Sequence, residues 1–216
     1  MFDVIIIGAG GFGREVYNWI KEISPSNSYK IKGFLDDNPH QFDGYTLDAG
    51  IISNIDDYKI CKNDRFIMAI GNIDDKKKVV GALRDKGAEF ISMIHPTAVI
   101  AQNVEIGQGV VICPFVTISD SATIGDFVMM HIYSSCGHDS EIGGYSILSP
   151  YSTVNGFSRL EDEVFMGTHS TVTASRKVGF RAKISANSVA MGDVPKYGFV
   201  YGVPGKVRVI FSGVNR

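Results

Sequence analysis

Several features that would place this chain in a specialised class are scarce or missing. Its 216 residues include only three cysteines, an odd number without CxxC spacing, so we expect reduced thiols in a cytoplasm. Neither Cys113 nor Cys136 has a neighbouring base in the sequence, which argues against thiol catalysis. The formal net charge of −2 and the pI near 6.2 indicate no surface for nucleic acid. The first strongly apolar segment, Val4 to Ile7, is too short for a signal peptide or a membrane span.

The feature that dominates the sequence is a repeat of six residues. From Ile94 to Ala190 every sixth residue is apolar, and the register never shifts. An amphipathic helix repeats every 3.6 residues and a sheet every two, so neither explains this period. Three short strands and three tight turns in each eighteen residues do explain it, with one inward side chain per strand and small or polar residues in the turns. We therefore predict a hexapeptide parallel β-helix over residues 93–195.

The first 92 residues predict a small α/β unit of the Rossmann type. Residues 3–7 are typical of a buried strand, the motif G-x-G-x-x-G follows at residues 8–13, and a helical pattern runs from Arg14 to Ile23. In this context such a motif binds the phosphates of a nucleotide, because the glycines allow close approach and the helix N-terminus favours an anion. A tight turn without a ligand is the alternative.

Two further strands of this unit end in polar residues. The strand expected over residues 30–35 leads into Asp36-Asp37, where a carboxylate would bind a hydroxyl group of a ribose or base. The strand expected over 66–70 leads into Gly71-Asn72. These strands are too few for the two halves of an NAD-binding domain. The unit is completed by a helix and a last strand, expected over residues 74–86 and 89–93.

The histidines of the repeat are the side chains best suited to proton transfer. His131, His138 and His169 stand one, two and three places after an inward position, so they do not align into a metal site. His138 is the best candidate for a general base, because imidazole titrates near neutrality and Asp139 could orient it. A surface histidine bound to the backbone is the alternative.

Small residues are expected to stack along two corners of the β-helix. Gly156 lies one coil beyond His138 and Ala174 lies two coils beyond it, with about 4.8 Å between successive coils. Because both residues are small, we expect an open groove beside His138. A second corner column holds Pro150, Thr168 and Ala186. The remaining residues, 196–216, are expected to cap the last coil, a role compatible with a ligand lid.

In order along the chain, these segments resemble those of a known family. The similarity is carried by residues 6–13, 34–37, 69–72, the hexads, Ser134-Ser135 to His138-Asp139, and Gly202-Val203-Pro204-Gly205-Lys206. The family is the group of hexapeptide-repeat acyltransferases that contains the sialic acid O-acetyltransferases and the bacterial sugar N-acetyltransferases. It includes the enzymes that acetylate UDP-linked amino sugars for bacillosamine.

The resemblance implies a left-handed β-helix, a homotrimer and acetyl-CoA bound between neighbouring solenoids, with no metal. It implies a cytoplasmic enzyme that acetylates the amino group of a nucleotide-linked amino-deoxy sugar for cell-surface glycans such as lipopolysaccharide O-antigen. His138 would be the base, Asp139 would raise its basicity, and the Gly156 N–H would face the thioester carbonyl. The resemblance also implies that CoA is bound by Thr168, Ala174 and Ala186. It implies that the nucleotide-sugar is bound by Gly10, Gly11, Phe12, Asp36, Asp37, Gly71 and Asn72.

The chain departs from the bacillosamine-type relatives at two positions. It has Ile147 where they carry a second histidine near the acetyl group, and His131 where they carry Asn. Both departures suggest a different sugar or a different acceptor atom. Three alternatives stay open: O-acetylation of a sialic-acid-like sugar, a non-catalytic nucleotide-sugar sensor and an NAD-dependent oxidoreductase.

Overall fold

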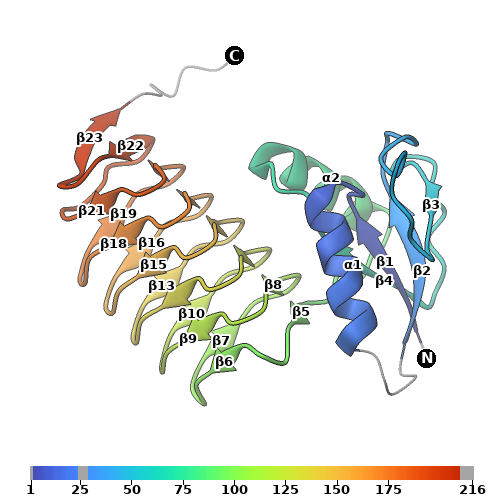
Figure 1. The fold of residues 1–216 in the computed structure, drawn as a ribbon, viewed down its shortest axis with the longest axis horizontal. Helices are drawn as coiled ribbons and strands as arrows, with labels where there is room; N and C mark the ends of the chain where they lie inside the picture. The colour runs from blue at the N-terminus through green and yellow to red at the C-terminus, as the bar shows by residue number, and fades with distance from the viewer. Residues whose placement is uncertain (1, 24–28, 210–216) are drawn as a thin grey trace. The chain divides into compact units, whose positions relative to one another are not determined.

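The computed structural model describes residues 2–23 and 29–209, and it divides the chain into two compact units, Met1–Met93 and Ile94–Arg216. The first is a small Rossmann-like α/β unit and the second is a left-handed parallel β-helix (Figure 1), which confirms the predicted fold class. Among the described residues, no helix has the length and apolar character needed to cross a membrane.

The N-terminal unit is built on a parallel sheet of four strands in the order β3-β2-β1-β4. Its strands are β1 (Phe2–Ile7), β2 (Tyr29–Leu35), β3 (Ile51–Ser53) and β4 (Asp64–Met68). Two helices, α1 (Gly11–Ile23) and α2 (Ile73–Asp85), accompany the sheet. Helix α1 forms because Val16, Tyr17 and Ile20 make one apolar stripe, and all three are buried.

One sequence-based expectation for this unit was wrong, and one strand was not anticipated. The strand expected over residues 89–93 is reduced to an isolated bridge between Phe90 and Phe66, and Met93 belongs to the first strand of the β-helix. The short strand β3 was not anticipated, because it has only three residues and pairs on one side with β2.

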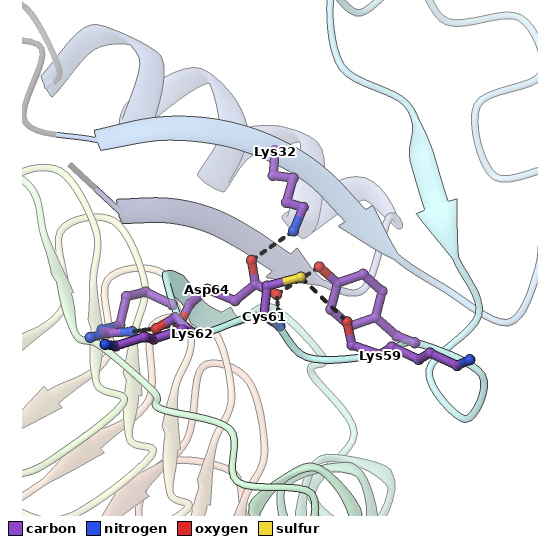
Figure 2. Close-up of polar contacts among 7 residues, drawn as sticks. Lys32, Lys59, Cys61, Lys62 and Asp64 are labelled. Carbon is purple, nitrogen blue, oxygen red and sulfur yellow. Dashed lines mark hydrogen bonds and ion pairs between the residues drawn. The ribbon is translucent and has the colours of Figure 1, made fainter.

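A buried carboxylate anchors the amino end of β4 (Figure 2). Asp64 is 2% exposed, and its Oδ1 accepts a hydrogen bond of 2.7 Å from Lys32 Nζ. Its Oδ2 accepts from the Tyr58 hydroxyl at 2.8 Å and from the Cys61 N–H at 2.7 Å. Burial alone would raise the pKa of Asp64, but these hydrogen bonds and the charge of Lys32 outweigh it and lower that pKa. The carboxylate is therefore a structural group, at the end of the sheet opposite the glycine motif.

The β-helix has three faces, each a sheet of short strands separated by eighteen residues. Face 1 consists of β5 (Met93–Ile94), β8 (Val111–Ile112), β11 (Met129–Met130), β14 (Ile147–Leu148), β17 (Phe165–Met166), β20 (Lys183–Ile184), β22 (Gly198–Tyr201) and β23 (Lys206–Val209). Face 2 consists of β6 (Val99–Ile100), β9 (Thr117–Ile118), β12 (Ser135–Cys136), β15 (Thr153–Val154), β18 (Thr171–Val172) and β21 (Val189–Ala190). Face 3 consists of β7 (Glu105–Ile106), β10 (Thr123–Ile124), β13 (Glu141–Ile142), β16 (Arg159–Leu160) and β19 (Lys177–Val178).

The hexad residues form the core of the β-helix. Every inward position from Ile112 to Ala190 is at most 2% exposed. The strands stack coil on coil along the solenoid (Figure 1), and parallel pairs such as Cys136 with Ile118 and Val154 satisfy the backbone. Cys136 is one of these core residues, and burial raises the pKa of its thiol to about 11.

The turns differ from the expectation of small or polar residues. Many of them place an aromatic residue in the left-handed backbone region, among them Phe115, Tyr133 and Tyr151, at φ of 58–60°. These three rings stack on one another at 4.9 Å between centroids, and His169 continues the stack at 4.6 Å. Contacts between successive coils therefore outweigh the local preference for glycine or asparagine at positive φ.

The C-terminal segment extends face 1. Strand β22 pairs in parallel with β20, and β23 pairs antiparallel with β22. The cap predicted over residues 196–216 is described only to Val209, and its last seven residues lie outside the described part of the chain.

Candidate functional site

The glycine motif lies at the carboxyl end of β1, and two of its glycines are required by the fold. Gly8 has φ of 96°, and its N–H donates to Leu35 O at 2.9 Å. A Cβ atom at Gly13 would lie 2.0 Å from Gly8 O, so only glycine lets α1 pack this closely on the strand. These two positions explain the turn without any ligand.

The other two glycines leave space beside the start of α1. A Cβ at Gly10 would meet no atom within 4 Å, and one at Gly11 would meet only the Arg14 guanidinium, at 3.9 Å. Helix α1 begins at Gly11 and has no acidic residue in its first turn. The positive end of the helix dipole can therefore accept an anion in that space. Phe12 follows, with its ring edge-on to Trp19 at 6.2 Å.

The acidic pair after β2 is already bound by the backbone. Asp36 accepts hydrogen bonds from the N–H groups of Ala9 at 2.7 Å and Asn38 at 2.9 Å. Asp37 accepts from the Ile55 N–H at 3.0 Å. The first role of these carboxylates is to order the loops around the glycine motif, although each oxygen keeps a second lone pair for a ligand hydroxyl.

Asn72 has a comparable structural role. Its Oδ1 caps α2 by accepting from the N–H groups of Asp74 and Asp75 at 2.9 and 3.1 Å. Gly71, the residue before it, has open space where a Cβ would be. The substrate roles predicted for these residues stay predictions.

In the β-helix, His138 lies on the edge between faces 2 and 3, here called the 2–3 edge. Its Nδ1 lies 2.8 Å from Asp139 Oδ2. A carboxylate in this position holds the Nδ1 proton, so that Nε2 carries the lone pair. The His138 side chain is 58% exposed, which leaves it accessible to a reactant.

Gly156 lies directly above His138 on the next coil. A Cβ at this position would lie 2.9 Å from both Cε1 and Nε2 of the imidazole, so any larger residue would displace the ring. Within the described part of the chain, the Gly156 N–H donates no hydrogen bond. The edge thus offers a proton acceptor and a vacant N–H donor side by side. Ala174, one coil further on, is exposed.

Phe157 contacts His138 and was not anticipated from the sequence. The two rings meet edge to face, with centroids 4.9 Å apart and an angle of 89°. The Phe157 N–H also donates to His138 O at 3.0 Å. Adding eighteen to position 139 leads to residue 157, so the same column arithmetic that identified Gly156 could have identified this residue.

Three other predicted residues lie away from His138 within the same chain. His131, Thr168 and Ala186 are on the edge between faces 1 and 2, here called the 1–2 edge, because each follows a face 1 strand. Ile147 lies in face 1 itself. One copy of the β-helix therefore does not bring Thr168 and Ala186 together with the imidazole.

An open groove of about 590 Å³ runs along face 3 and the turns that follow its strands, and none of its lining residues lies on the 2–3 edge. Its floor carries Glu141 and Arg159, which form an ion pair of 2.6 Å, together with Lys177. Among the described residues, no group of three His, Cys, Asp or Glu side chains could hold a metal ion.

Comparisons with known proteins bear on both units. Residues 3–83 match the PglD N-terminal domain. The chain is 39% identical over 74 residues to GDP-perosamine N-acetyltransferase of Escherichia coli O157:H7, which covers 34% of each chain. It is 28% identical over 116 residues to UDP-N-acetylbacillosamine N-acetyltransferase of Bacillus subtilis, which covers 52% of this chain and 51% of the relative. The matches thus span about a third and about half of these relatives.

The likeness in structure extends over nearly the whole chain. PerB from Caulobacter crescentus, solved in complex with CoA and GDP-perosamine, superposes with a TM-score of 0.87. The alignment covers 96% of this chain and 98% of PerB, at 24% identity. These findings confirm the resemblance to bacterial sugar acetyltransferases, and at this identity the superposition itself shows a shared fold.

Proposed function

We propose that this protein transfers the acetyl group of acetyl-CoA to the amino group of a nucleotide-linked amino sugar. The relatives named above are N-acetyltransferases of such sugars. The observation that carries the proposal is the 2–3 edge, where the exposed His138–Asp139 pair lies beside the vacant N–H of Gly156. Acyl transfer to an amine needs these two groups, a base and an oxyanion donor.

In the proposed reaction the sugar amine attacks the thioester carbonyl carbon. His138 Nε2 takes the proton that the amine loses, and Asp139 on Nδ1 stabilises the imidazolium. The Gly156 N–H donates to the carbonyl oxygen as its negative charge develops. When the intermediate collapses, the C–S bond breaks, and the imidazolium returns the proton to the CoA thiolate. The products are the acetylated sugar and free CoA.

The N-terminal unit is assigned the nucleotide part of the acceptor. The space beside Gly10 and Gly11, at the N-terminus of α1, suits a diphosphate. Asp36, Asp37 and the Gly71-Asn72 turn flank the carboxyl ends of neighbouring strands, where ligands of open α/β sheets bind. The two named relatives act on GDP- and UDP-linked sugars, so the identity of the base is left open.

The proposal includes a homotrimer in the cytoplasm that serves the synthesis of cell-surface glycans such as lipopolysaccharide O-antigen. If Thr168 and Ala186 line the CoA arm, they must come from the 1–2 edge of a second copy, since His138 is on the 2–3 edge of its own chain. Sedimentation of the purified chain tests the trimer separately from the chemistry.

A thiol-release assay with acetyl-CoA tests the reaction directly. The acceptor panel consists of UDP-, dTDP- and GDP-linked amino sugars, with a sialic acid as the O-acetylation arm. We expect consumption of acetyl-CoA with at least one amino sugar, and a reduction of turnover by about 10²–10⁴-fold in His138→Ala. Consumption with the sialic acid alone, or none with any acceptor, would contradict the proposal.

A matched control for the base is His40→Ala. His40 also contacts a carboxylate through Nδ1, at 3.1 Å from Asp43, and it is 76% exposed. It should keep full turnover at saturating substrate. If His138→Ala and His40→Ala behaved alike, His138 would have no part in the chemistry.

A further inference from the structure

One residue of the β-helix breaks the pattern of its hexads. The fifth position of each hexad is Ala, Val or Ser in every repeat from Ile94 to Pro195 except one, where it is Arg176. From Val110 to Val194 all the other residues at this position are buried, whereas Arg176 is half-buried. Residues that precede Arg176 in its own column, Ser140 and Ser158, are at most 1% exposed. A long cation has therefore replaced a small core residue at one place.

The guanidinium of Arg176 is poorly satisfied by the protein. Its Nε is buried and has no hydrogen-bond partner among the described residues. Other arginines are paired: Arg159 binds Glu141 at 2.6 Å and Arg181 binds Glu163 at 2.6 Å. Buried donors in native proteins are almost always hydrogen-bonded, whether by the protein, by an ordered water or by a ligand.

Arg176 lies on the same edge as the proposed acyl-transfer site. It follows Ala174, which stacks above Gly156 and His138, and it immediately precedes β19 on face 3. Two coils separate it from His138, a rise of about 10 Å along the helix axis. Arg176 thus lies further along this edge, on the side toward which the coils lead away from His138.

We propose that Arg176 binds the phosphate groups of the acyl-CoA co-substrate, an inference that rests on the proposed function. CoA carries its thioester at one end and a diphosphate and a 3′-phosphate at the other, with a neutral pantetheine arm between them. A guanidinium is the side chain best matched to phosphate oxygens, because its N–H groups can donate in pairs. Binding would give the outer N–H groups of the guanidinium phosphate oxygens as acceptors.

The experiment compares donors that retain or lack the phosphates. Steady-state kinetics are measured for wild type, Arg176→Gln and Arg176→Lys with acetyl-CoA, acetyl-dephospho-CoA and acetyl-pantetheine. We expect Arg176→Gln to lower kcat/KM for acetyl-CoA by about 10–100-fold, the loss typical of a hydrogen bond to a charged group. It should leave kcat/KM for acetyl-pantetheine unchanged. Arg176→Lys keeps the charge without the paired donors and should show a smaller loss with the same selectivity.

The donor series also locates the contact. If Arg176→Gln also has a lower kcat/KM than wild type with acetyl-dephospho-CoA, the contact is to the diphosphate. If the two proteins have equal kcat/KM with this donor, the contact is to the 3′-phosphate. Equal kinetics of wild type and variants, or an equal loss with acetyl-pantetheine, would overturn the proposal, since the role would then be absent or merely structural. The control Arg159→Gln, which removes an exposed and ion-paired cation one coil earlier, should match wild type with every donor.

Calorimetry with free CoA separates this inference from the function on which it rests. If wild type binds no CoA, the acetyltransferase proposal itself is wrong. If wild type binds CoA and Arg176→Gln binds it equally well, only the role of Arg176 is wrong.

Discussion

The two units use their polar residues differently. In the N-terminal unit, Asp36, Asp37 and Asn72 all accept hydrogen bonds from backbone N–H groups, and they hold the loops in place. Beside the 2–3 edge of the β-helix, parallel pairing satisfies the strands, whereas on the edge itself the exposed His138 side chain and the Gly156 N–H are left for other partners. Substitutions in the first unit should therefore affect stability or ligand binding, and those on the edge should affect the chemistry.

The sharpest test of this contrast is Gly156→Ala, which should reduce turnover by about 10²-fold. The added Cβ would lie 2.9 Å from the imidazole, so the ring must move, and a shift of this size commonly costs that much in rate. Thermal unfolding should change less than turnover, because the imidazole is exposed and can give way, although the Cβ would also lie 3.1 Å from His138 O. Turnover equal to wild type would mean that the position of the His138 ring does not matter.

Asp64→Asn should show the opposite behaviour. It leaves Lys32 without its carboxylate partner and should lower the free energy of unfolding by about 2 kcal/mol, measured by denaturant titration. Turnover of the folded fraction should be unchanged. The control Asp48→Asn removes an exposed partner of Lys21 and should leave the free energy of unfolding unchanged, because solvent screens such pairs.

The same carboxylate predicts a pH dependence of stability. The pKa of Asp64 is lowered in the folded protein, so its stabilising effect is complete above the unfolded value of about 3.9 and is lost as the pH falls through the folded value. Wild type should therefore lose more stability than Asp64→Asn between about pH 5 and pH 2. Parallel pH profiles of the two proteins would contradict this assignment.

The sequence predicted the β-helix well because its signal is local and repeated. Each inward residue recurs every six positions, and each coil pairs only with the coils eighteen residues away, so register follows from counting. The turn aromatics were missed because their positive φ is stabilised by rings on other coils, such as Tyr133 on Tyr151. The column of His138, Gly156 and Ala174 was predicted by the same counting.

Less of the structure of the N-terminal unit could be predicted from the sequence pattern. The glycine motif and both helices were placed within a few residues, since strand, turn and helix are contiguous there. What the motif could not reveal is that Gly8 and Gly13 are needed for packing, whereas Gly10 is not. That distinction depends on which atoms surround each Cβ position, a property of the folded unit alone.

Gly10→Ala exploits this distinction and should have a moderate effect. Because a Cβ there meets no protein atom, unfolding should be unaltered or slightly harder. If the space holds a diphosphate, the methyl group should weaken binding of the nucleotide-sugar by about tenfold, which calorimetry would detect. Gly13→Ala is the comparison, since its Cβ meets Gly8 O and should destabilise the unit. Unchanged affinity in a stable Gly10→Ala protein would move the nucleotide elsewhere.

The smallest expected effect belongs to Phe157, the positioning residue beside His138. An edge-to-face pair is worth about 0.5–1.5 kcal/mol, so Phe157→Leu should lower kcat by about 2–10-fold. KM for acetyl-CoA should be unchanged, and Phe157→Tyr, which keeps the ring, should restore kcat. Since Phe157 is 61% exposed, a merely structural role would predict no change in kcat for either variant. An increase in KM for acetyl-CoA without a change in kcat would instead place this ring against the co-substrate. The 2–3 edge would then bind the donor as well as carry the base, and the contrast between a structural first unit and a reactive edge would be incomplete.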